Sequence, residues 1–176
     1  MIIVTHEMEF AKHVANRVFY MDQGGIYEEG TAEEIFEHPQ RTNTRRFVRA
    51  LRALEFDVDS KDFDFLGSQT LIADFAYKNN MPKNLEEKLL AIMEELYQMI
   101  IIQPEEQNKM HVSFEYNAVE KSLTGLVPFT GPKFDMTDPM YMFSWPIIAH
   151  KAYKAEVEDA HMDGFTNKVI LKIAND

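Results

Sequence analysis

Cysteine is absent from this chain of 176 residues. Its absence excludes a disulfide framework, thiolate chemistry and a thiolate metal site, and it fits a reducing compartment. No apolar run approaches the ~20 residues that a membrane-spanning helix needs. The first residues also lack the basic region and the small-residue cleavage site of a signal peptide. We therefore expect a cytoplasmic protein, and 45% hydrophobic residues are enough to build a globular core.

Positive charge is scarce in most of the chain. The net charge is -11, of which residues 1–53 carry -1 and residues 54–176 carry -10. So acidic a second part argues against nucleic acid and anionic lipid as its partners. The motif Gly-x-x-x-x-Gly-Lys-Ser/Thr is also missing, so the chain has no loop of that kind to cradle nucleotide phosphates. Its histidines show no close metal-ligand spacing, and no metal site is expected.

The first part predicts a short buried strand, a helix, a hairpin, a capped helix and a basic helix. These elements are expected over residues 2–5, 8–16, 18–29, 31–38 and 44–54. In the hairpin, Gly24-Gly25 supplies the positive φ of a tight turn. Thr31-Ala32-Glu33-Glu34 has the form of a capping box. The basic helix is expected to carry Phe47, Leu51 and Leu54 on one side.

After Leu54 the composition changes, and a domain boundary is expected near residue 53. The elements expected beyond it are a strand, two helices, two strands, a helix and a strand, over residues 55–60, 66–78, 85–102, 110–116, 122–127, 145–157 and 168–173. The second helix is strongly amphipathic. This order predicts an α+β fold, a two-layer sandwich in which a mixed sheet has its helices on one face, preceded by a small α/β segment.

Residues 1–53 contain a series of short motifs: Val4-Thr5-His6-Glu7-Met8, Phe10-Ala11, Arg17-Val18-x-x-Met21-Asp22-Gln23-Gly24, Glu28-Glu29-Gly30 and the run from Pro39 to Phe47. Through these motifs the segment resembles the C-terminal end of the ATP-binding subunits of polar amino-acid ABC transporters. The resemblance makes His6 the switch histidine, which contacts the γ-phosphate in that family of ATPases. Without a phosphate loop in the same chain, His6 is expected to be vestigial and the chain to be no enzyme by itself.

Residues 54–176 resemble, by element order and two short motifs, the GHKL ATPase domain of histidine kinases and anti-sigma-factor kinases. Ala91 to Ile100 is similar to the N-box helix, with Glu94 at the general-base position but Gln98 in place of the magnesium-binding asparagine. An extra methylene displaces that ligand oxygen, and Mg²⁺ tolerates little error in geometry. Glu94 is therefore expected to be a vestigial base.

A second motif, Leu126 to Asp135, is similar to the Asp-Asn-Gly-Pro-Gly-Phe-Asp loop of GHKL proteins. Phe129 replaces the aspartate that reads adenine, and Lys133 replaces a glycine that lies close to the nucleotide. The resemblance implies a degenerate nucleotide site formed by Gln98, Phe129, Thr130, Gly131 and Lys133. No cofactor is expected, ATP with Mg²⁺ being the ancestral ligand. Phe129, Phe143 and Trp145 are expected to fill the vacated cavity.

These resemblances predict the C-terminal part of an amino-acid ABC transporter ATP-binding protein that carries a non-catalytic GHKL-like domain for regulation or dimerisation. The expected partners are ABC transporter subunits or a second copy, and the membrane is approached only through a permease. Two alternatives stay open. One is a divergent GHKL-type ATP-binding protein or serine kinase using Glu94 and Gln98, and the other is a small-molecule sensor domain.

Overall fold

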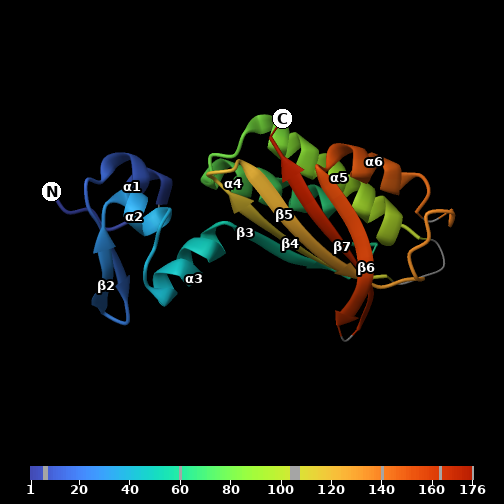
Figure 1. The fold of residues 1–176 in the computed structure, drawn as a ribbon, viewed down its shortest axis with the longest axis horizontal. Coiled ribbons are helices and arrows are strands. Elements are labelled where there is room, and N and C mark those ends of the chain that lie inside the picture. Colours follow the sequence, from blue (N-terminus) through green and yellow to red (C-terminus); the bar gives the residue numbers. More distant parts are fainter. Residues whose placement is uncertain (6–7, 60, 104–107, 140, 163, 176) are drawn as a thin grey trace. The chain divides into compact units, whose positions relative to one another are not determined.

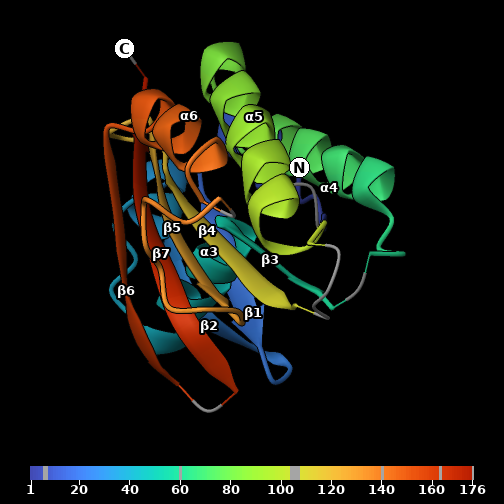
Figure 2. The same cartoon turned by 90° about the vertical axis from the view of Figure 1, so that its right-hand side faces the viewer.

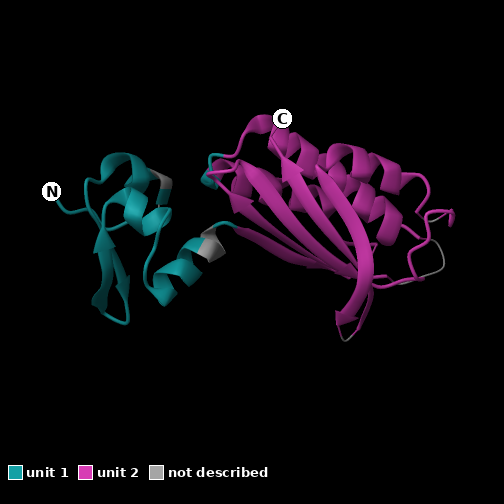
Figure 3. Ribbon diagram, in the orientation of Figure 1, with its two compact units in different colours: residues 1–52, 78–80 teal, residues 53–77, 81–176 magenta. Residues whose placement is uncertain are grey.

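The computed structural model describes residues 1–5, 8–59, 61–103, 108–139, 141–162 and 164–175, with the backbone alone at residues 9 and 49–51. The chain forms two compact units (Figure 3). Unit 1 comprises residues 1–52 with residues 78–80, and unit 2 comprises residues 53–77 with residues 81–176.

Unit 1 contains a β-hairpin and three short helices (Figure 1). Its elements are α1 (Met8–Val14), β1 (Val18–Asp22), β2 (Gly25–Gly30), α2 (Ala32–Phe36) and α3 (Thr42–Leu51). The hairpin turn has positive φ at Gln23 (50°) and Gly24 (82°), whereas the sequence predicted it at Gly24 and Gly25. A two-residue turn needs positive φ at both central residues, and these are Gln23 and Gly24 because β2 already begins at Gly25.

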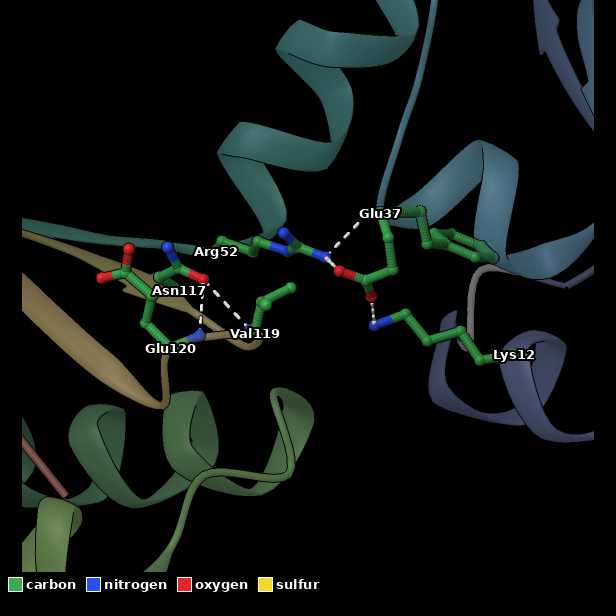
Figure 4. A network of polar contacts seen from close by, with 7 residues as sticks. Lys12, Glu37, Arg52, Asn117, Val119 and Glu120 are labelled. Carbon is green, nitrogen blue, oxygen red and sulfur yellow. Dashed lines mark hydrogen bonds and ion pairs between the residues drawn. The ribbon is translucent and has the colours of Figure 1, made fainter. Parts of the chain in front are cut away.

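The capping box predicted at Thr31 is confirmed. The Thr31 hydroxyl accepts from the Glu34 N–H at 3.2 Å, and the Glu34 carboxylate accepts from the Thr31 N–H at 2.8 Å. The helix ends at Phe36, and the Glu37 side chain beyond it contacts two basic side chains (Figure 4). Its carboxylate accepts from Arg52 at 2.7 Å and lies 3.6 Å from Lys12. This pair of contacts ties α1, α2 and the end of α3 together.

The prediction of a buried strand at residues 2–5 is wrong. Met1, Ile2 and Val4 are more than nine-tenths exposed, and β1 and β2 alone make up the sheet of unit 1 in the described part of the chain. A strand needs a neighbour for its N–H and C=O groups and an apolar cover for its side chains. Neither is supplied to residues 2–5 by unit 1, so an apolar run alone does not make a strand here.

Unit 2 is a five-stranded sheet with all three of its helices on one face (Figure 2), which confirms the α+β sandwich predicted from the sequence. Its elements are β3 (Ala53–Val58), α4 (Phe65–Lys78), α5 (Lys83–Ile100), β4 (Met110–Asn117), β5 (Ser122–Phe129), α6 (Ser144–Lys151), β6 (Lys154–Met162) and β7 (Phe165–Ala174). The strand order is β3-β4-β5-β7-β6, and every pairing is antiparallel. The sequence predicted a mixed sheet, and this detail is wrong, because each neighbouring pair of strands runs in opposite directions.

Two predicted boundaries in this region are wrong. Leu54 does not continue the basic helix: it lies in β3, pairs with Phe114 of β4 and is buried. The helix predicted to reach Val157 ends at Lys151, and strand β6 follows it. From Lys154 to Glu158 side chains alternate between exposed and half-buried, and this period of two belongs to a strand.

The core of unit 2 lies between α5 and the sheet. The predicted apolar face of α5 is confirmed, since its members Leu85, Leu89, Ile92, Met93, Leu96 and Met99 are all buried. They meet the inward side chains of β4, β5 and β7, such as Val112, Val127 and Leu171. Each large apolar side chain buried in this way contributes roughly 1.5–3 kcal/mol, and this layer holds the loops around it in place. No described helix has the length and apolar character needed to cross a membrane.

Candidate functional site

The candidate site is the end of β5 with the loop that follows it to α6. Phe129, the last residue of β5, has no exposed surface and contacts Tyr141 edge-on, with their ring centres 6.4 Å apart. Phe134 packs against Tyr141 and Trp145 at 4.9 Å and 5.0 Å between ring centres. These four rings form a continuous cluster, which we call the aromatic plug.

The prediction for Phe143 is wrong, because its side chain is 73% exposed. Tyr141, which the sequence reading did not select, is fully buried in its place. The reason is a turn in which the Tyr141 and Met142 N–H groups both donate to the Asp138 carbonyl. This turn directs Tyr141 inward and leaves Phe143, two residues later, outside.

A buried asparagine on β7 holds the backbone of the loop between β5 and α6 by two hydrogen bonds. Asn167 on β7 is 1% exposed; its Nδ2 donates to the Pro132 carbonyl at 2.8 Å and its Oδ1 accepts from the Phe134 N–H at 2.9 Å. The Tyr141 hydroxyl also donates to the Pro132 carbonyl, at 2.7 Å. The sequence reading missed Asn167. The signal for it was a polar residue in register with the apolar, inward positions Val169 and Leu171 of the same strand.

Thr130 and Gly131 lie where the loop leaves the sheet. The Thr130 hydroxyl accepts from the Lys109 N–H at 2.9 Å and donates to Asn108 Oδ1 at 3.3 Å, while the Thr130 N–H donates to the Lys109 carbonyl at 3.0 Å. Gly131 has a φ of 130°, which side-chain-bearing residues rarely adopt. Lys133 points away to the surface, where its Nζ lies 3.3 Å from the Asp159 carboxylate.

Glu94 and Gln98 lie one helical turn apart on α5, and both side chains are exposed. In the described ranges no hydrogen bond or ion pair joins either side chain to the loop of residues 130–134. Among the described residues, no group of three carboxylates or histidines is placed to hold a metal ion. His6 lies outside the described residues.

The electrostatics of the loop are local. Two hydrogen bonds from Thr137, one from its N–H and one from its hydroxyl, both at 2.8 Å, hold the pKa of the Asp135 carboxyl below its ordinary value. Such a pair forms an Asx-type turn and stabilises the charged carboxylate. Asp135 thus caps its own loop rather than facing the aromatic plug. The arrangement as a whole is an exposed loop held by hydrogen bonds over a cluster of aromatic rings, of which Phe129, Tyr141 and Trp145 are buried.

Part of the chain is similar in sequence to known proteins. A probable amino-acid import ATP-binding protein of Bacillus subtilis is 57% identical over 49 residues, which are 28% of this chain and 20% of that protein. The L-cystine import ATP-binding protein of the same organism is 55% identical over 49 residues, 28% of this chain and 19% of its own length. The homologues of this segment are amino-acid ABC transporter ATP-binding proteins. No protein-family model matches the chain.

A longer match is found in the methionine import ATP-binding protein of Lactobacillus johnsonii, at 33% identity over 79 residues, 45% of this chain and 23% of that protein. The chain therefore spans about a fifth of the length of the curated relatives it matches.

Proposed function

We propose that this chain is the C-terminal part of an amino-acid ABC transporter ATP-binding protein, and that residues 54–176 are an accessory domain without catalytic activity. The 57% identity over 49 residues carries the first half of the proposal. A segment of that length fits within the part of the sequence that carries the family motifs, residues 1–53. The partners would then be ABC transporter subunits. The chain would lie at the inner face of the membrane and contact it only indirectly, through a permease.

The second half of the proposal is that unit 2 is a GHKL-like domain that has lost its nucleotide. The comparisons offer no support for this relationship, and it depends on the element order and on Glu94 and Gln98 one turn apart on α5. The loss of the nucleotide is inferred from Phe129, which stands at the adenine-reading position and is buried in the aromatic plug. A regulatory or dimerising role, with a homodimer as the functional form, fits such a domain.

Calorimetric titration of the whole chain with ATP and Mg²⁺, repeated with a nonhydrolysable analogue, tests the absence of a nucleotide site. We expect no binding at millimolar nucleotide, because entry requires displacing Tyr141 and breaking the two hydrogen bonds to the Pro132 carbonyl. Micromolar, magnesium-dependent binding that is lost in Glu94→Ala would overturn the proposal. It would establish the divergent GHKL-type ATP-binding protein or kinase instead.

The sensor alternative is tested by a second titration, followed by fluorescence. A small molecule that replaces the aromatic plug would quench or shift the fluorescence of Trp145, the single tryptophan of the chain. Titration with the twenty amino acids and with methionine and cystine analogues, each followed by this fluorescence, separates a sensor from an accessory domain that binds protein alone.

A further inference from the structure

Helix α3 presents positive charge that the rest of unit 1 does not neutralise. Its sequence, Thr42–Leu51, contains three arginines and no acidic residue. Arg45 and Arg46 are exposed, and in the described part of the chain neither guanidinium takes part in a hydrogen bond or an ion pair. The arginines on either side behave differently. Arg41 stacks over the Tyr27 ring at 3.9 Å, and Arg52 donates to Glu37.

Helix α5 of unit 2 presents the opposite charge. Glu87 and Glu94 are exposed and seven residues apart, which places them on one side of the helix, about 10 Å apart along its axis. Neither is in an ion pair within the described ranges. The lysines of the same helix are already engaged: Lys83 lies 2.9 Å from Glu86, and Lys88 donates to the Ala174 carbonyl at 3.0 Å.

We propose that Arg45 and Arg46 on α3 of one copy bind Glu87 and Glu94 on α5 of a second copy. This inference depends on the homodimer of the proposed function and names its contact surface. A guanidinium is a planar fork that matches a carboxylate with two parallel hydrogen bonds, so exposed arginines without partners fit carboxylates without partners. In a two-fold dimer the contact occurs twice and closes, so the assembly stops at two copies.

The occupant is a second copy because the chain itself supplies the complementary charge. Residues 54–176 carry a net charge of -10, and the net charge of -11 on each copy makes two copies repel each other at long range, which the local attraction between the two helices must overcome. Charged interface contacts set orientation and partner choice more than raw affinity. The dimer is therefore expected to be weak and to depend on the local match of the two helices.

The test uses two variants of the full chain, each with one surface reversed. Arg45→Glu with Arg46→Glu makes both surfaces acidic, and Glu87→Arg with Glu94→Arg makes both surfaces basic. Each variant alone should lose self-association by at least about tenfold, the effect of ~1.4 kcal/mol. Mixed together they should form a heterodimer, because both contacts in that pair are again complementary. Sedimentation velocity and native mass spectrometry measure the species.

A matched control is Lys61→Glu with Lys78→Glu. It changes the net charge by the same amount as the α3 variant, but at two exposed lysines outside α3 and α5. It should self-associate like the wild type. Circular dichroism checks that every variant is folded. Reversal variants that dimerise normally would overturn the α3–α5 contact and leave the homodimer standing. A wild-type chain that stays monomeric would overturn the homodimer itself.

Anionic vesicles of phosphatidylglycerol distinguish the remaining partner class. If the wild-type chain is monomeric and co-sediments with these vesicles, and the α3 variant does not, the arginines bind a lipid surface and the proposal is wrong. We expect no co-sedimentation of the wild type, since the chain as a whole carries a net charge of -11.

Discussion

Asn167 holds Pro132: its Nδ2 donates to the Pro132 carbonyl at 2.8 Å, from a strand position where the other inward residues are apolar. The second atom of the same amide, Oδ1, accepts from the Phe134 N–H. One side chain thus satisfies two backbone groups of the loop that leads to the aromatic plug. Because the amide is fully buried, water cannot take over either bond without opening the loop.

Replacing Asn167 should be among the more damaging polar substitutions in unit 2. Asn167→Ala leaves the Phe134 N–H without its acceptor, and we expect a loss of about 1–3 kcal/mol in the free energy of unfolding. Urea denaturation followed by Trp145 fluorescence measures it, since Trp145 contacts Phe134 directly.

The control for Asn167 is Asn117→Ala. Asn117 likewise bonds to two backbone groups, but its Oδ1 accepts both bonds, from the Val119 and Glu120 N–H groups at 3.0 Å and 3.1 Å (Figure 4), and it lies on an exposed turn. Water replaces those bonds, so the loss should stay below about 1 kcal/mol. Equal losses at the two asparagines would contradict the role assigned to Asn167.

Two substitutions of Tyr141 distinguish the stability that its ring contributes by packing from the stability that its hydroxyl contributes by hydrogen bonding. Tyr141→Phe should lower stability by only about 0.5–1.5 kcal/mol, because the Pro132 carbonyl keeps its bond from Asn167. Tyr141→Ala empties a fully buried site and should lower it by about 3–5 kcal/mol.

A double-mutant cycle links Tyr141 to Asn167. With Tyr141→Phe and Asn167→Ala combined, the Pro132 carbonyl loses both donors, so the double variant should be less stable than the sum of the single effects by more than about 0.5 kcal/mol. Additive losses would mean that the two donors act independently. Urea titrations of the four proteins under one set of conditions provide the cycle.

Gly125 should tolerate no side chain. It pairs with Phe114 across β4 and β5, and a Cβ atom built on it would lie 2.3 Å from Phe114 Cε1. Gly125→Ala forces that ring out of its packing, and we expect a loss of about 1–3 kcal/mol or more. Phe114→Leu in the same chain should recover part of the loss by removing the clashing ring atoms.

Gly25→Ala in unit 1 is the matched control for Gly125→Ala. A Cβ at Gly25 meets no atom within 4 Å, and its φ is not positive. Its effect should stay within about 0.5 kcal/mol, measured by hydrogen exchange of the β1 and β2 amides. If Gly125→Ala is as neutral as Gly25→Ala, the packing of Phe114 described above is incorrect.

The elements that the sequence predicted correctly are those whose signal is local. The apolar face of α5 repeats every three to four residues, and the capping box at Thr31 needs only four residues to define it. Residues 2–5 failed because a strand is defined by its neighbours, and composition cannot supply them. Strand β6 was not predicted, because the helix expected from residue 145 was extended to Val157 although the residues around Val157 alternate between exposed and half-buried.

The site was harder to predict than the fold. The motif comparison led to Phe129, and the structure buries it, but the plug also depends on Tyr141 and Asn167, which are far apart in sequence. Their roles come from a turn at Asp138 and from the register of β7, both set by long-range packing. A sequence shows which side chains are available, and the register decides which of them share a carbonyl.

The stability of unit 1 should fall in acid through Glu28. Partial burial acts to raise the pKa of its carboxyl, but hydrogen bonds from the Gln40 and Arg41 N–H groups and the nearby Arg41 guanidinium outweigh it and lower the pKa below its usual 4.5. The unfolded chain then binds the proton more tightly. The contribution of Glu28 is complete above about pH 4.5 and is lost as the pH falls through the lower folded pKa.

Hydrogen exchange of the Gln40 and Arg41 amides as a function of pH measures this directly, because both donate to the Glu28 carboxylate, at 2.8 Å and 3.1 Å. After correction for intrinsic exchange, protection should decrease as the solution is acidified below pH 4.5. Glu28→Gln removes the titrating group, so the protection should be weaker at neutral pH and nearly independent of pH. Glu33→Gln, whose side chain accepts no hydrogen bond from the described backbone, should keep the wild-type profile. An unchanged pH profile in Glu28→Gln would show that another carboxylate controls the acid sensitivity of the connection between α2 and α3.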